Sequence, residues 1–187
     1  MAGTVRTTMI EGATRLLATR GLQGTSFSEV LELTGAPRGS VYHHFPDGKE
    51  QLVGEAIDLA GARAIDVLDQ LAGSTPEAVA DRFLSLWRSV LTMSELRAGC
   101  AVLAVTIATD SPELLDRTAA VFRTWRERLT GLLVEGGVPD AEAARFAATL
   151  IAASEGAVVL ARAEQSLVPF DLVAESLRAQ AATLPGS

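Results

Sequence analysis

The stretch that decides the fold is TSFSEVLELTGAPRGSVYHHF, residues 25–45. Ser26 with a glutamate three positions later has the spacing of a capping box that begins a helix. Gly35 can adopt the left-handed backbone that ends this helix, and Pro37 suits the opening of the next one. The pattern therefore predicts a short helix, a tight turn and a second short helix over 38–44, as in a helix-turn-helix.

The second of these helices carries an unusual set of polar side chains. Val41 and Phe45 are four residues apart and can be buried against the preceding helices. The residues between and before them would then face outward, where an arginine fork suits guanine and hydroxyl or imidazole groups suit phosphates. A glycine there allows close approach to a groove wall, and a lysine at the start of the following helix adds charge for another phosphate. The predicted DNA contacts are Thr25, Ser26, Arg38, Gly39, Ser40, Tyr42, His43, His44 and Lys49.

Composition supports a helical protein with an electrostatically divided chain. The 187 residues fit one or two compact domains, and 48% are apolar while only 5% are aromatic, so alanine and leucine must build most of the core. The net charge is −7, yet residues 1–49 sum to +1 and residues 50–187 to −8. Only the first segment is suited to a polyanion.

The fold is predicted to be all-α, with an N-terminal three-helix helix-turn-helix DNA-binding domain and a larger helical C-terminal domain. The domains are predicted at 1–48 and 49–187, with 49–72 as a connecting helix. Caps, prolines and glycines delimit the helices. They are expected at 4–20, 49–72, 76–94, 98–108, 111–135, 140–165 and 170–183.

Two other function classes explain the sequence less well. A small helical enzyme is disfavoured because no nucleophile, phosphate-binding or zinc-binding motif is present, and both histidines lie in the segment 38–45. A helical interaction module leaves the polar face of that segment unexplained. We expect no cofactor and no metal. With one cysteine, no apolar run of membrane-spanning length and no signal-peptide pattern, we also expect a cytoplasmic protein without membrane contact.

The segment from Thr25 to Leu52 resembles the DNA-binding signature of the TetR/AcrR family of bacterial regulators. That signature has a Thr-Ser opening, a glycine-rich block ending in Tyr-x-His-Phe, and Lys-Glu-x-Leu. The version PRGSVYHHFPDGKEQL is similar to the LmrA/YxaF-like branch, although one extra residue separates Phe45 from Lys49. The resemblance implies that the C-terminal domain, residues 49–187, serves for ligand binding and dimerisation. It also implies a homodimer on a pseudo-palindromic operator, most often a repressor released by a small lipophilic effector, aromatic ones included.

Aromatic residues mark a candidate effector site in the body. In 76–94 and 111–135 apolar residues, the aromatic ones among them, recur at spacings of three and four and form an apolar stripe on each helix. Such stripes are compatible with ordinary core packing as well as with a pocket for a planar ligand. The resemblance implies that 98–108 moves when ligand binds, and its cysteine is either a sensor or an inert buried thiol. The predicted ligand residues are Phe83, Trp87, Cys100, Leu103, Phe122 and Trp125.

A ridge of small residues marks a candidate dimer surface. Four residues at four-residue spacing in 140–165 would let another helix approach closely, either from the same chain or from a partner: Ala144, Ala148, Ala152 and Gly156. The sequence leaves these alternatives open, and the resemblance implies pairing through 140–165 and 170–183. Glu155 is the candidate buried acid, expected to contact ligand or partner.

Overall fold

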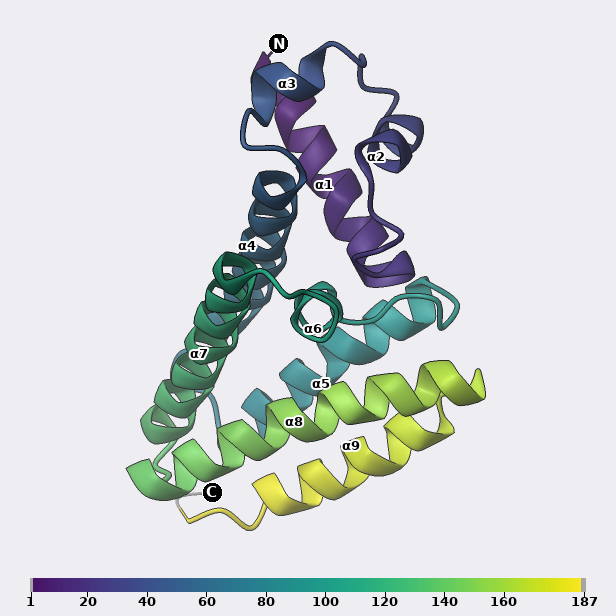
Figure 1. Ribbon diagram of the computed structural model, residues 1–187. Coiled ribbons are helices and arrows are strands. Elements are labelled where there is room, and N and C mark those ends of the chain that lie inside the picture. Colours follow the sequence, from purple (N-terminus) through teal and green to yellow (C-terminus); the bar gives the residue numbers. More distant parts are fainter. Residues whose placement is uncertain (1, 186–187) are drawn as a thin grey trace. The chain divides into compact units, whose positions relative to one another are not determined.

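The computed structural model describes residues 2–185, with side chains from Val5 onward. Over these residues the chain is all-α, as predicted, and Figure 1 follows its helices in order. They are α1 (Ala2–Arg20), α2 (Phe27–Thr34), α3 (Ser40–His44), α4 (Lys49–Leu68), α5 (Pro76–Met93), α6 (Ala101–Thr106), α7 (Pro112–Glu135), α8 (Asp140–Glu164) and α9 (Val168–Ala181), with a 3-10 turn η1 (Asp69–Leu71) after α4.

The chain forms two compact units, and neither is a single continuous segment. The first comprises residues 1–62 and 100–121, and the second comprises residues 63–99 and 122–187. The helix-turn-helix region therefore shares its unit with α6 and the first part of α7, whereas the sequence divided the chain after residue 48. Helices α4 and α7 each contribute residues to both units.

In the first unit, α1 is the central helix and packs against both α2 and α6. Met9, Ala13 and Leu17 of α1 are fully buried and form the inner face of this helix. They share the core with apolar side chains from every other helix of the unit: Val30, Val41, Phe45, Leu52, Val53, Ile57, Val102, Val105 and Leu114.

Within this unit the first part of α7 lies closely along α4. A side chain added at Gly61 would come within 2.9 Å of Val121, and one added at Gly54 within 3.0 Å of Arg117. The guanidinium of Arg117 also donates to Asp58 of α4 at 2.9 Å. A larger residue at Gly61 would force Val121 to shift, whereas at Gly54 the flexible Arg117 side chain would need to move only slightly.

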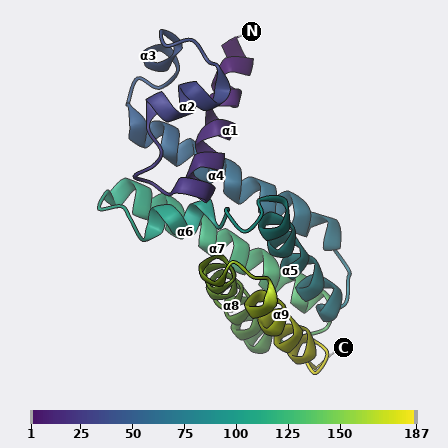
Figure 2. The ribbon, with the colours of Figure 1, turned by 90° about the vertical axis from the view of Figure 1, so that its right-hand side faces the viewer.

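In the second unit, α8 and α9 lie side by side and antiparallel, and α5 packs against both (Figures 1 and 2). By length and apolar composition α8 is the one helix of the described chain that could cross a membrane, a feature that the sequence analysis did not identify. Here it serves as a core helix. The buried side chains include Phe83, Leu84, Trp87, Leu91, Trp125, Leu129, Leu132, Phe146, Leu150, Val158, Phe170 and Leu177.

Three helices are shorter than predicted by two residues or more. Helix α4 ends at Leu68 rather than at residue 72, where the 3-10 turn η1 follows. Helices α3 and α6 are shorter for local reasons. Helix α3 begins at Ser40 rather than at residue 38, because the carbonyl of Pro37 accepts both the Ser40 N–H at 3.0 Å and the Ser40 hydroxyl at 2.6 Å in a turn that precedes the helix. Helix α6 spans Ala101–Thr106 rather than 98–108, because the Cys100 sulfur caps its first turn by accepting the Leu103 N–H at 3.3 Å.

Candidate nucleic-acid interface

The helix-turn-helix is held by the caps that the sequence predicted. The Ser26 side chain accepts the Glu29 N–H at 3.2 Å, which satisfies one of the free donors at the start of α2. Gly35 has a φ of 67°, and its N–H donates to the Leu31 carbonyl at 2.9 Å. The Glu29 carboxylate pairs with Arg20 of α1 rather than folding back on its own helix. Caps and ion pair together fix where α2 starts, where it ends and how it meets α1.

Helix α3 has only five residues and is anchored by two apolar side chains. Val41 and the C-capping Phe45 are 6% and 1% exposed, as their four-residue spacing predicted. The ring of Phe45 lies 6.2 Å from that of Phe27 and 5.5 Å from the Arg6 guanidinium. A helix this short has little stability of its own, so these contacts determine its position.

The outer side of α3 and of the turn before it is open to solvent. Tyr42 is 85% exposed, Arg38, Gly39 and His43 are exposed, and His44 is half-buried with its ring 5.0 Å from that of His43. A side chain added at Gly39 would meet no atom within 4 Å, so another surface can approach the backbone there. Among the described residues, no group of three His, Cys, Asp or Glu side chains is placed to hold a metal ion. This face combines donors suited to bases and phosphates.

Four of the predicted contacts have their polar groups engaged within the protein. Thr25 is 1% exposed and its hydroxyl donates to the Gly21 carbonyl at 2.8 Å. Ser26 caps α2, and the Ser40 hydroxyl donates to the Pro37 carbonyl. The Lys49 ammonium donates to the Leu22 carbonyl at 3.0 Å. The free donor face is therefore narrower than the nine residues that the sequence indicated.

A hydrogen-bonded chain that the sequence analysis missed links the end of α3 to α4 and α1. The Asp47 N–H donates to the Gln51 side chain at 3.2 Å, and the Gln51 amide donates to Glu55 at 3.1 Å. Glu55 also accepts from Arg6 at 2.5 Å, and Arg6 lies over Phe45. The only sequence signal was the Lys-Glu-x-Leu block, which does not reveal a partner more than forty residues away.

Four of the predicted ligand residues form one aromatic cluster in the second unit. Trp87 lies edge-to-face with Phe83 at 6.4 Å and with Trp125 at 6.3 Å, and Phe122 lies 5.5 Å from Trp125. The indole Nε1 of Trp87 is buried, and it has no hydrogen-bond partner among the described residues. Such a donor costs free energy unless water or a ligand accepts its hydrogen.

The other two predicted ligand residues belong to the first unit. Cys100 is 6% exposed and caps α6, and Leu103 of that helix is half-buried. The structure thus assigns the six residues to two units rather than to one. Helix α6, which carries Leu103, packs against α1.

The small-residue ridge lies on the outside of the second unit. Ala144, Ala148, Ala152 and Gly156 are all exposed, so another helix of the same chain does not cover them. Glu155 is 7% exposed and is buried within its own chain. Leu150 and Val158 of the same helix are also buried within the chain, unlike Val159. The exposed apolar residues of this region are instead Val159, Leu160, Val168 and Leu172.

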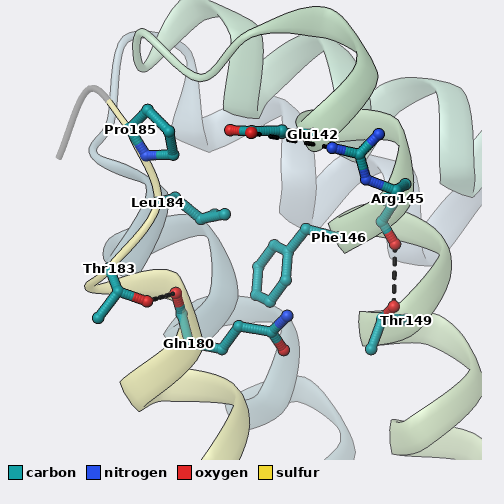
Figure 3. A pocket seen from close by; sticks show the side chains of 8 residues that line it. All are labelled: Glu142, Arg145, Phe146, Thr149, Gln180, Thr183, Leu184 and Pro185. Carbon is teal, nitrogen blue, oxygen red and sulfur yellow. Dashed lines mark hydrogen bonds and ion pairs between the residues drawn. The ribbon is translucent and has the colours of Figure 1, made fainter.

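An open pocket of about 530 Å³ lies between the start of α8 and the end of α9. Phe146 and Leu184 line it, beneath an ion pair of 3.8 Å between Arg145 and Glu142 (Figure 3). It contains none of the predicted ligand residues. The remaining lining residues are Thr149, Gln180, Thr183 and Pro185.

Comparison with known proteins agrees with the geometry of both units. Residues 9–56 match the model of the tetR family of bacterial regulatory proteins, and residues 76–176 match the C-terminal domain of LmrA/YxaF-like transcriptional regulators. The uncharacterized HTH-type transcriptional regulator Rv0196 of Mycobacterium tuberculosis is 34% identical, with 92% of each chain covered. The HTH-type transcriptional regulator LmrA of Bacillus subtilis is 27% identical, with 90% of this chain and 92% of that one covered.

Solved structures show the same architecture. A TetR transcriptional regulator from Chloroflexus aurantiacus superposes with a TM-score of 0.82 and 29% identity, covering 98% of this chain and 97% of that one. Regulators of this kind bind DNA and are not enzymes, as the sequence analysis expected. The exposed donors on α3, the caps of α2 and the matches over both units lead to one conclusion: the chain belongs to the TetR family of transcriptional regulators, in its LmrA/YxaF-like branch.

Proposed function

We propose that this regulator is a cytoplasmic repressor that binds a pseudo-palindromic operator as a homodimer and is released by a small lipophilic effector. The observation that carries the proposal is the division of α3, whose apolar side chains are buried while its donors face solvent. A surface built this way is suited to enter a major groove. In domain terms, residues 1–48 would read DNA, and residues 49–187 would bind effector and dimerise.

Each exposed side chain has a separate task in this proposal. Arg38 reads a guanine through its forked guanidinium, and Gly39 allows the backbone to come close to the groove wall. Tyr42, His43 and His44 donate to phosphates and set the orientation of the helix on the duplex. Tyr42 supports this assignment most directly, because an aromatic residue that is 85% exposed contributes little to the fold.

The homodimer would form through α8 and α9. The exposed ridge from Ala144 to Gly156 permits close approach of two helices, and Val159, Leu160 and Leu172 add apolar surface beside it. A two-fold axis through this surface relates the α3 helix of one protomer to the α3 helix of its partner. Two recognition helices can then meet two half-sites of one operator.

The effector would bind against the aromatic cluster of the second unit. Indole and phenyl faces stack on planar ligands, and the Trp87 N–H needs an acceptor. We therefore propose a lipophilic, planar effector that carries a hydrogen-bond acceptor such as a carbonyl oxygen.

Release would depend on the contacts of α6 and α7 in the first unit. Helix α6 packs on α1, and α7 packs on α4 through Gly54 and Gly61. A ligand that displaces α6 would move α1, on which α6 packs, and α7, which follows α6 in the chain and packs on α4. Either movement would misalign the two recognition helices. The free energy of operator binding that is lost cannot exceed the difference between the effector's binding free energies for the two conformations.

The deciding experiment is a salt titration of binding to duplexes that tile the DNA upstream of the protein's own gene. A scrambled duplex of the same composition is the control, and fluorescence anisotropy gives the affinity. We expect sequence-dependent binding whose logarithm falls with log salt by about 0.9 for each phosphate contacted. The matched variant Tyr42→Phe removes one hydroxyl and should weaken binding without changing the unfolding temperature. Equal affinity for the tiled and scrambled duplexes at every salt concentration would reject this operator assignment.

A further inference from the structure

Lys49 is the first residue of α4, where its charge at a helix start led us to expect a phosphate contact. Lys49 is half-buried, and its ammonium donates to the Leu22 carbonyl at 3.0 Å, across 27 residues of sequence. Both residues lie in the first unit. The charge is therefore engaged with the protein's own backbone.

The carbonyl that accepts this hydrogen bond is held firmly in place. Leu22 lies in the turn between α1 and α2, its side chain is 9% exposed, and its carbonyl also accepts the Thr25 N–H at 3.3 Å. Gly21 takes the left-handed conformation with a φ of 70°, and its own carbonyl accepts the Thr25 hydroxyl. The turn is consequently a fixed anchor rather than a loose loop.

The Lys49 side chain extends toward this turn from the start of α4, whose backbone is also held in a defined conformation. Gly48 has a φ of 81°, which sets the direction in which α4 begins, and the Gln51 side chain accepts the N–H of Asp47 just before it. The carbonyl end of α1 carries partial negative charge, so a cation beside it is favourable. Geometry and charge thus both favour the contact between Lys49 and the turn.

We propose that Lys49 is a positioning residue, which ties the start of α4 to the turn between α1 and α2, rather than a phosphate contact. Ser26 caps α2 four residues after Leu22, so the tie determines where α2 begins relative to α4. Movement of α4 then reaches α3 by two routes, directly through residues 45–48 and indirectly through the turn and α2. The effect on DNA binding rests on the operator function proposed above, whereas the tie itself is independent of it.

The test is the salt dependence of operator binding by Lys49→Met, which keeps the apolar stem and removes the donor. A positioning role predicts affinity lower by about tenfold, the equivalent of roughly one charge-assisted hydrogen bond, at every salt concentration. The slope of log affinity against log salt should stay that of the parent. A phosphate contact predicts instead a slope smaller in magnitude by about 0.9 for each protomer. That result, or an unchanged affinity, overturns the proposal.

Thermal unfolding supplies a readout that needs no DNA. We expect Lys49→Met to lower the unfolding temperature of the first unit, and Lys49→Arg, which keeps charge and donor, to restore both the temperature and the affinity. Arg15→Met is the matched control, because it removes the same charge from an exposed position of the same unit. If Lys49→Met and Arg15→Met unfold at the parent's temperature, the tie is absent. If the parent binds no duplex while the temperatures differ as expected, the operator assignment fails and the tie stands.

Discussion

Replacing Phe45 by alanine should remove the contacts that hold α3, the proposed recognition helix, against the rest of the first unit. Phe45 is 1% exposed and caps the end of α3, where its ring meets Phe27 and the Arg6 guanidinium. Truncation of a buried phenylalanine costs about 3–5 kcal/mol. Since the stability of a whole domain is about 5–15 kcal/mol, the variant should lose ordered α3 and with it operator binding.

The positions of the tryptophans allow the unfolding of the two units to be followed separately. Trp87 and Trp125 both lie in the second unit, so their fluorescence in urea follows that unit, while far-UV circular dichroism follows all helices. With an m-value of about 2 kcal/mol/M, Phe45→Ala should move the first part of the circular dichroism transition lower by roughly 2 M urea. The tryptophan transition should move less.

Tyr42→Ala is the matched control on the same short helix. Because Tyr42 is 85% exposed, its removal should change stability by no more than about 0.5 kcal/mol while still weakening operator binding. If Phe45→Ala unfolds within experimental error of the parent, or binds operator with the parent's affinity, the anchoring of α3 by its buried residues is refuted.

Three further predictions concern the operator, the dimer and acid stability. Arg38→Ala should cost about 1–3 kcal/mol and relax specificity at one base pair, as measured with singly substituted duplexes; unchanged specificity would assign base reading to another residue. Ala152→Glu places a charge on the exposed ridge and should yield a folded monomer in sedimentation equilibrium, and a persistent dimer would place the interface elsewhere. The hydrogen bond from Arg88 lowers the pKa of Asp171, so this pair should stabilise the fold fully at neutral pH and lose its contribution as acidification passes through the folded-state pKa. Because both side chains are 45% exposed, Asp171→Asn should cost at most about 1 kcal/mol at pH 7 in urea titrations, and nothing at a pH below that pKa; a larger cost would mean that the pair is shielded from solvent.

Predictions that depended on neighbouring residues agreed with the structure. The Ser26 cap and the Gly35 turn involve atoms three or four residues apart, so their spacing in the sequence contains the whole interaction. The burial of Val41 and Phe45 followed from their four-residue spacing on one helix face. Helix ends were predicted less well where a competing turn intervened, as at Pro37.

Predictions that depended on distant partners were incomplete. Lys49 has a residue type suited to phosphates, but nothing near it in sequence reveals that the Leu22 carbonyl, 27 residues earlier, accepts its hydrogen. The chain from Arg6 through Glu55 was missed for the same reason. Periodicity also could not tell which unit an aromatic or a cysteine would join, since that depends on which helices meet.

By itself, then, the sequence determined the all-α class, the helix-turn-helix and the family, because capping, turn formation and helix periodicity are encoded within a few residues. Only the tertiary structure decided which donors remain free for DNA and which helices share a unit with the helix-turn-helix. It also decided that the ridge from Ala144 to Gly156 faces outward. Each of these depends on contacts between segments far apart in the chain, where the same side chain can face a neighbouring helix or solvent with no change in local pattern.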